Sequence, residues 1–173
     1  MSTRCQVKVS DYAERENVSK AVTLYHHSDG YPTAMLQVMA DAYKNAKKYL
    51  EEKAKGHGIP ISYWELNRAG EIASFLCREE PDQFEPEAGH QLHGDIEWYY
   101  ELKPSNTDRS NAANPKWIVT VYKITGFDKD QKKIPIVEGE LQAAAKLAEA
   151  IEAKGDKIAN EEYEKREKKR MKA

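Results

Sequence analysis

Histidine and carboxylate side chains gather in two short segments of the chain, which makes them the first candidates for chemistry. His26, His27 and Asp29 follow one another closely, and His90 and His93 are three residues apart. Imidazole and carboxylate groups can hold Zn²⁺ or another divalent ion if folding brings the two segments together. Adjacent residues on a strand point to opposite faces, however, so His26 and His27 cannot readily chelate one ion. We therefore expect surface or turn histidines and assign no metal or other cofactor from the sequence.

The sequence contains none of the common catalytic motifs. It has no Gly-x-Ser-x-Gly elbow, no phosphate-binding or dinucleotide-binding glycine loop and no His-Glu-x-x-His. Cys5 and Cys77 are far apart, each in an apolar stretch, which predicts two reduced, buried thiols. These features favour a binding protein over an enzyme, and we name no catalytic residue. The first alternative is a metal-binding or ligand-binding enzyme centred on the corner formed by His26, His27 and Asp29.

Charge is distributed unevenly along the chain although its total is near zero. The 173 residues include 27 Lys and Arg against 29 Asp and Glu, which gives a formal net charge of −2. This balance excludes a generally basic protein that binds nucleic acid over its whole surface. Acidic residues, with neither Lys nor Arg among them, are spread from Glu79 to Glu101. We interpret this acidic stretch as a surface for a protein partner that is itself basic.

The predicted strand at 94–103 contains the most regular pattern within the acidic stretch. Asp95, Glu97, Tyr99 and Glu101 alternate with apolar residues, so they share one face of the strand. Tyr99 would stand between two carboxylates as an exposed aromatic anchor, a residue type that protein interfaces favour. An edge strand that protects itself with charge would show the same pattern. We therefore predict an acidic and aromatic binding face, with this structural explanation as its alternative.

The last residues of the chain are basic. Lys165, Arg166, Lys168, Lys169 and Arg170 lie on a predicted helix, where they could contact phosphate groups without reading a base sequence. Acidic residues interspersed from position 156 to 167 weaken that interpretation, because mixed charge is typical of a solvated helix. Nucleic-acid binding through this tail is the second alternative function.

The elements that must position these residues follow from the spacing of apolar side chains. Alternating or continuous apolar residues predict strands at 3–9, 21–26, 94–103 and 117–124, with a proline-containing edge piece at 134–137. Helical spacing predicts helices at 34–55 after Thr33 as N-cap, from a capping box at Ser62 to Pro81, at 140–153, and at 156–172 beyond a break at Gly155.

This order of elements predicts an α+β fold. We expect an antiparallel sheet of four to five strands with helices packed on one face, plus a charged C-terminal helix. Residues 1–153 would form a single α+β domain, and residues 154–173 the charged helix or tail. The apolar runs are too short for a membrane span, and no secretory signal is evident at the N-terminus, so we expect a cytoplasmic protein.

Three sequence stretches resemble a set of small uncharacterised proteins of phages, prophages and related mobile elements. They are Ser2-Thr3-Arg4, the segment Leu24–Pro32 with its Tyr-x-His-x-Asp-Gly-Tyr-Pro pattern, and Gly94–Tyr100 with its Gly-Asp-Ile-Glu start. The resemblance covers residues 1–125 and implies an accessory or host-interaction role in the host cytoplasm. It also singles out a structured turn, made of Tyr25, His27, Asp29, Gly30 and Tyr31.

Overall fold

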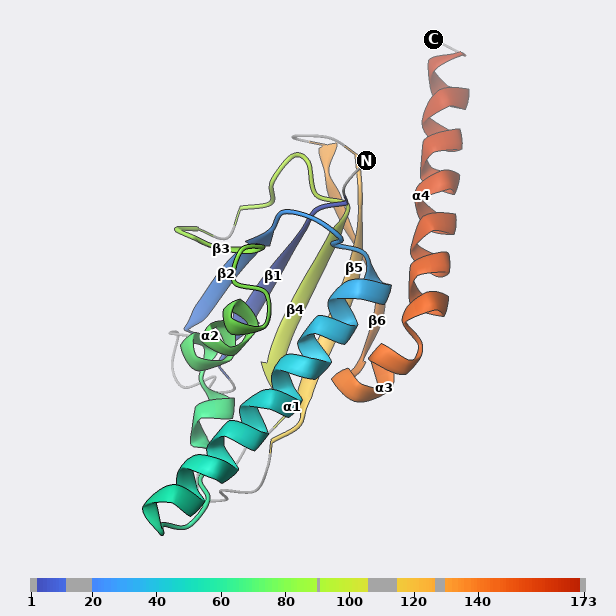
Figure 1. Cartoon of the computed structure of the whole chain (residues 1–173). Helices are drawn as coiled ribbons and strands as arrows, with labels where there is room; N and C mark the ends of the chain where they lie inside the picture. The colour runs from blue at the N-terminus through green and yellow to red at the C-terminus, as the bar shows by residue number, and fades with distance from the viewer. Residues whose placement is uncertain (1–2, 12–19, 90, 106–114, 127–129, 172–173) are drawn as a thin grey trace.

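A mixed β-sheet forms one layer of the molecule (Figure 1). The computed structural model describes residues 3–11, 20–89, 91–105, 115–126 and 130–171. Within these residues the sheet has six strands in the order β3-β2-β1-β4-β5-β6. β1 and β4 are parallel, and the other neighbouring strands are antiparallel. The strands are β1 (Cys5–Ser10), β2 (Ala21–His26), β3 (Phe84–Glu87), β4 (Trp98–Pro104), β5 (Trp117–Thr125) and β6 (Lys132–Glu140).

One face of this sheet builds the main hydrophobic core. Cys5, Val7 and Val9 of β1 are fully buried there, because alternate residues of a strand point to the same face. The same face continues across the sheet through Trp98, Tyr100, Leu102, Trp117, Val119 and Val121. Burial also raises the pKa of the Cys5 thiol well above its usual value, so this cysteine stays protonated.

The helices pack on that face. The described residues form α1 (Pro32–His57), the short 3₁₀ helix η1 (Trp64–Asn67), α2 (Ala69–Glu79), α3 (Leu141–Lys146) and α4 (Ala148–Arg170). Figure 1 shows α1, α2 and α3 in front of the sheet, while α4 runs beside β5 and β6 and extends beyond the sheet towards the C-terminus. No helix in this part of the chain has the length and apolar character that a membrane crossing would need.

The predicted fold class is confirmed, with refinements to the sheet. The sheet is mixed rather than wholly antiparallel, because β1 and β4 run in the same direction. It also contains β3, a four-residue edge strand in a segment for which we predicted neither a strand nor a helix. β6 is longer than the predicted edge piece and carries a register shift opposite Val121 and Tyr122. Both edge strands contain a proline, Pro86 in β3 and Pro135 in β6.

Some predicted helix boundaries are wrong. Thr33 does not cap α1, whose N-cap is Tyr31; instead its hydroxyl and backbone N–H donate to Glu152 Oε2 at 2.7 and 3.1 Å, which ties α1 to α4. The break in the last helical region falls at Leu147 rather than at Gly155. The domain boundary placed at residues 153 and 154 therefore lies inside α4.

Gly155 continues the helix because α4 approaches the sheet closely at this point. A Cβ atom on Gly155 would overlap the Trp98 ring, which is only 1% exposed. Lys123 of β5 reinforces the contact, since its ammonium lies 4.3 Å from the Trp98 ring centroid and 3.0 Å from Asp156 Oδ1. Tertiary packing thus outweighs the low helix propensity of glycine, which amounts to about 1 kcal/mol.

The Gly155 contact gives a first prediction. Gly155→Ala should lower the free energy of unfolding by about 1–3 kcal/mol, because a fixed aromatic ring leaves no room for the added methyl group. Gly56→Ala in α1 is the matched control: nothing lies within 4 Å of the added Cβ atom. The control should stabilise the protein slightly through helix propensity. Urea denaturation of both variants measures the difference, and equal effects would show that the close approach is unimportant.

Candidate functional site

A tight turn places the end of β2 against the start of β1. Asp29 adopts a left-handed backbone conformation with φ of 51°, so the positive φ of this Asp-Gly turn lies at Asp29 and not at Gly30. Gly30 is required for a different reason: a Cβ atom there would lie 2.7 Å from the backbone of Arg4 and Cys5. Its N–H donates to the carbonyl of Thr3 at 2.8 Å, and its carbonyl accepts from the buried Tyr100 hydroxyl at 2.9 Å.

A polar pocket of about 480 Å³ opens on the sheet face opposite the helices. Gln6, Tyr25 and Glu85 lie opposite one another across β1, β2 and β3, so their side chains form one row on this face. The segment between β3 and β4 supplies further side chains. The pocket is lined mainly by Arg4, Tyr25, His27, Glu85, Glu87, His93 and Asp95.

Gln6 fixes the segment that follows β3 over the sheet. Its side chain is fully buried, and its amide nitrogen donates to Glu87 and to the carbonyl of Gln91 at 3.0 Å. The amide oxygen accepts from the backbone N–H of His93 at 3.2 Å. Because both ends of this one amide are used, Gln6 determines where His93 lies.

Tyr25 forms the floor of the pocket. The rings of His27 and His93 stand against it, with centroids at 4.9 and 4.7 Å. Its hydroxyl donates to Asp95 Oδ2 at 3.0 Å, and the same oxygen accepts from Arg4 at 2.6 Å. Burial together with the hydrogen bond to Asp95 raises the pKa of Tyr25 to about 12, so the phenol remains a donor at neutral pH.

Carboxylates outnumber permanent positive charges in this pocket. Glu85 pairs with His27 at 3.1 Å, and Glu87 pairs with His93. Asp95 pairs with Arg4, the one guanidinium among the described residues of the lining. His27 and His93 are about half exposed, with 49% and 48% of their side chains accessible. The pocket therefore combines two accessible carboxylates, Glu85 and Asp95, and the more buried Glu87 with flat ring surfaces.

The structure brings only some of the predicted histidines together. His27 and His93 share the pocket, whereas His26 is 2% exposed on the other face, where it contacts Glu80 at 2.7 Å and the ring of Phe84. This separation of His26 from His27 follows the strand alternation. Asp29 is exposed in the turn and does not line the pocket. His90 lies outside the described residues.

No group of three or more His, Cys, Asp or Glu side chains in the described ranges is arranged to hold a metal ion. His27 and His93 each face a separate carboxylate instead of a common centre. The possible ligands are therefore engaged in two distinct His–Glu pairs.

The predicted acidic and aromatic face differs in the structure. Tyr99 is 4% exposed, so the expectation of an exposed aromatic anchor is wrong. Tyr122 of β5 lies beside it, and the Lys133 ammonium from β6 sits 4.2 Å from the Tyr99 ring centroid. Burial, followed by the nearby Glu101 charge, raises the pKa of Tyr99. Tyr99 thus belongs to a small apolar cluster with Tyr25, Ile96 and Ile124.

The carboxylates of this strand contact positive charges from other segments. Glu101 accepts from Lys133 at 2.6 Å and from the Tyr122 hydroxyl at 2.9 Å. Burial alone would raise its pKa, but these hydrogen bonds outweigh burial and lower it. Glu97 lies 3.5 Å from Lys123. Tertiary contacts therefore compensate part of the negative charge of the acidic stretch. Three of its other acids, Glu85, Glu87 and Asp95, line the polar pocket around Tyr25.

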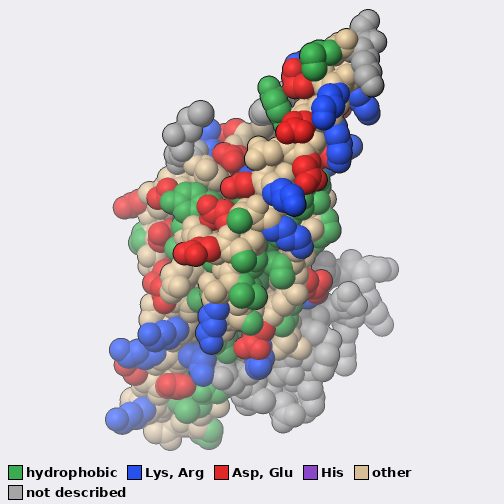
Figure 2. All heavy atoms as spheres, turned by 90° about the vertical axis from the view of Figure 1, so that its right-hand side faces the viewer, with side chains coloured by type: hydrophobic (Ala, Val, Ile, Leu, Met, Phe, Trp, Pro, Cys, Tyr) green, Lys and Arg blue, Asp and Glu red, His purple; other side chains and the backbone are tan. Residues whose placement is uncertain are grey.

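The basic C-terminal residues lie on the exposed end of α4. Figure 2 shows this end projecting from the body with Lys or Arg and Asp or Glu side chains intermixed. Lys165 pairs with Glu162 at 2.9 Å, and Lys168 and Arg170 have acidic neighbours one turn away. Arg166 and Lys169 instead border the start of β6. Nucleic-acid binding by this tail stays a prediction.

Several residues of this region were not identified from the sequence as site residues. Among them are Arg4, which precedes β1, the pocket residues Glu85 and Glu87 of β3, and Gln6 of β1, which donates to Glu87. The alternation of Glu85 and Glu87 was visible in the sequence, but Pro86 between them obscured the strand.

Comparisons with models of protein families, with curated proteins and with solved structures found no match. The resemblance to phage and mobile-element proteins therefore stays a prediction, and the residues of the pocket carry the functional argument.

The role of Gln6 gives a second prediction. Gln6→Leu should lower the free energy of unfolding by about 2 kcal/mol, because the part-buried Glu87 carboxylate, Gln91 carbonyl and His93 N–H all lose their partner. Hydrogen exchange at the His93 amide should accelerate at the same time. Gln37→Leu, at an exposed position of α1, serves as control and should change stability by less than about 0.5 kcal/mol. Unchanged exchange at His93 in the Gln6 variant would contradict the anchoring role.

Glu101 gives a third prediction, on pH dependence. Its folded-state pKa lies below the ordinary value of 4.5, so its stabilisation is present above that value and is lost as pH falls through the folded pKa. Glu101→Gln should therefore destabilise the protein at neutral pH and much less in acid. Urea denaturation across this range measures the effect, with Glu52→Gln at an exposed site of α1 as control. A pH-independent difference would rule out the proposed ionic contribution.

Proposed function

We propose that this protein is a small accessory protein that binds a basic segment of a protein partner in the pocket beside β2 and β3. The observation that carries this proposal is the placement of Glu85, Glu87 and Asp95 around one accessible pocket, in which Arg4 is the single guanidinium that the described part of the chain supplies. Complementary charge of this kind steers a partner and selects against acidic surfaces. An Arg or Lys side chain is the group that fits such a lining best.

The rings of the pocket support the same choice of ligand. His27 and His93 flank Tyr25, so a long aliphatic stem could lie between flat walls while its charged end reaches a carboxylate. Cations also interact favourably with the faces of aromatic rings. Glu85 is the most accessible acid here, with 67% of its side chain exposed, and so is the first carboxylate that a partner would meet.

The resemblance to phage and mobile-element proteins adds to this proposal. Under that resemblance the partner is a host protein met in the host cytoplasm, and the small protein acts by occupying a basic surface. The proposal keeps the predicted class of function, macromolecular binding. It changes the surface that performs it, from the face around Tyr99 to the pocket around Tyr25.

A charge-neutralising variant tests the proposal. Glu85→Gln combined with Asp95→Asn should weaken binding of a tetralysine peptide roughly tenfold, since the loss of two half-exposed charge pairs amounts to about 1.4 kcal/mol. Isothermal titration calorimetry at low and high salt measures the affinity, and binding of the unmodified protein should fall as salt rises.

The matched control removes two carboxylates elsewhere. Glu52→Gln combined with Glu149→Gln changes net charge equally at exposed positions of α1 and α4. Equal weakening by both double variants would show that the peptide follows overall charge and not the pocket. Absence of peptide binding to the unmodified protein would also overturn the proposal. Reversal of Glu101 is a poor test, because that side chain contributes to stability through Lys133.

A further inference from the structure

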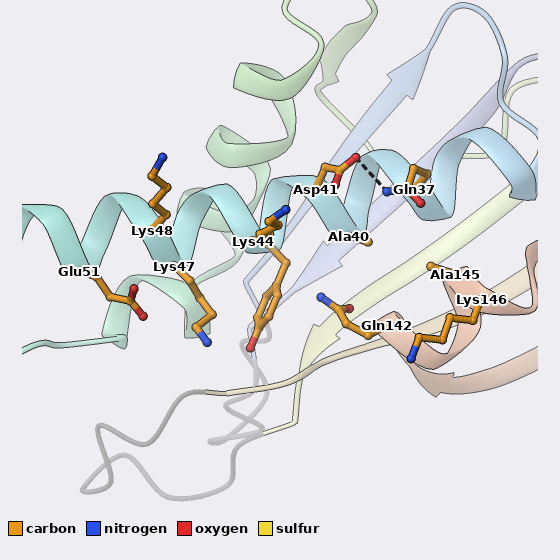
Figure 3. A pocket seen from close by; sticks show the side chains of 11 residues that line it. Gln37, Ala40, Asp41, Lys44, Lys47, Lys48, Glu51, Gln142, Ala145 and Lys146 are labelled. Carbon is orange, nitrogen blue, oxygen red and sulfur yellow. Dashed lines mark hydrogen bonds between the residues drawn. The ribbon is translucent and has the colours of Figure 1, made fainter.

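A second concave site lies among the helices, in a groove between α1 and α3 (Figure 3). The groove has a volume of about 600 Å³, which is within the usual size range of small-molecule sites. Ala40 of α1 and Ala145 of α3 face each other across it. Because both side chains are small, the two helices leave an opening instead of interlocking.

The floor of the groove is rigid and largely apolar. Tyr43 is fixed at both ends, since its hydroxyl donates to the carbonyl of Pro115 at 2.8 Å and its ring packs against Trp117 with centroids 5.1 Å apart. Gln142 points into the gap in Figure 3. The floor therefore offers a flat ring and methyl groups, with one amide for hydrogen bonding.

Lysines surround this floor. Lys44, Lys47 and Lys48 of α1 and Lys146 of α3 line the groove, together with two carboxylates from the residues that the structure describes. Among the described residues, Lys44, Lys47 and Lys146 form no ion pair, which contrasts with the compensated charges around Glu101. The two carboxylates accept from neutral donors: Asp41 from Gln37 at 2.9 Å and Glu51 from the Tyr63 hydroxyl at 2.9 Å.

We propose that the groove between α1 and α3 binds a small organic phosphate of the nucleoside diphosphate class. The phosphates would lie against Lys146, one helical turn from Gln142 on α3, while Lys47, at the opposite end of the groove in Figure 3, would attract them over a longer distance. The flat base would rest on the apolar floor beside Tyr43 and meet the Gln142 amide. The lysines favour a ligand with several negative charges, and the apolar floor favours a flat aromatic group. An inorganic anion would contact the lysines but leave the floor unoccupied. This site and ligand are independent of the acidic pocket proposed above.

Titration with adenosine diphosphate tests this inference. The unmodified protein should bind the nucleotide with one-to-one stoichiometry in calorimetry. Pyrophosphate should bind at least tenfold more weakly because it lacks the base, and adenosine should bind at least tenfold more weakly because it lacks the charge. In amide NMR spectra the nucleotide should shift the signals of Ala40, Gln142 and Ala145.

Variants locate the binding. Lys47→Gln combined with Lys146→Gln should weaken nucleotide binding at least tenfold, whereas Lys157→Gln, at an exposed position of α4, should leave it unchanged. Circular dichroism melting shows whether each variant is folded. Equal affinity for the nucleotide and pyrophosphate, no effect of the double variant, or no binding at all would overturn the inference. So would tighter binding of a single-stranded oligonucleotide, which would identify a polymer as the ligand.

Discussion

The parallel pairing of β1 with β4 is the constraint on which the rest of the structure depends. Neighbouring parallel strands require a long connection that returns over one face of the sheet. That connection contains α1 and α2, so both helices cover the same face and close the core. The opposite face then stays open beside β2 and β3. The pairing also brings Arg4 to Asp95, which are 91 positions apart, and so completes the polar pocket.

Local alternation predicted much of the fold, whereas pairing between distant strands could not be predicted. The core faces of β1 and β4 and the separation of His26 from His27 follow from period-two spacing within one strand. Whether β4 runs parallel or antiparallel to β1 cannot be predicted from that spacing, because the alternation within each strand is the same in both cases. Gly155 shows the same limit for helices, because contact with Trp98 decides its conformation against local propensity.

The candidate site was partly predictable for a related reason. His27 and His93 were singled out in the sequence as possible metal ligands, and Tyr25 through the turn that the resemblance indicates, and all three line the pocket. Tyr99 was misjudged because the residues two positions away on the same strand face, Glu97 and Glu101, are acidic, while Tyr122 and Lys133 contact its ring in the folded structure. A run of carboxylates in the sequence therefore overstates the charge that the folded surface presents. Only the tertiary partners show which acids stay accessible.

Pro86 and Pro135 have a consequence for how the sheet meets other molecules. Each removes a backbone donor from one of the two outermost strands, and β3 has only four residues while β6 carries a register shift. Such edge strands are poor templates for pairing with a strand of another chain. This disfavours edge-to-edge association of the sheet. A partner that adds a strand is disfavoured for the same reason. Recognition by this protein is thus left to side chains, and specificity rests on their chemistry rather than on shared backbone hydrogen bonding.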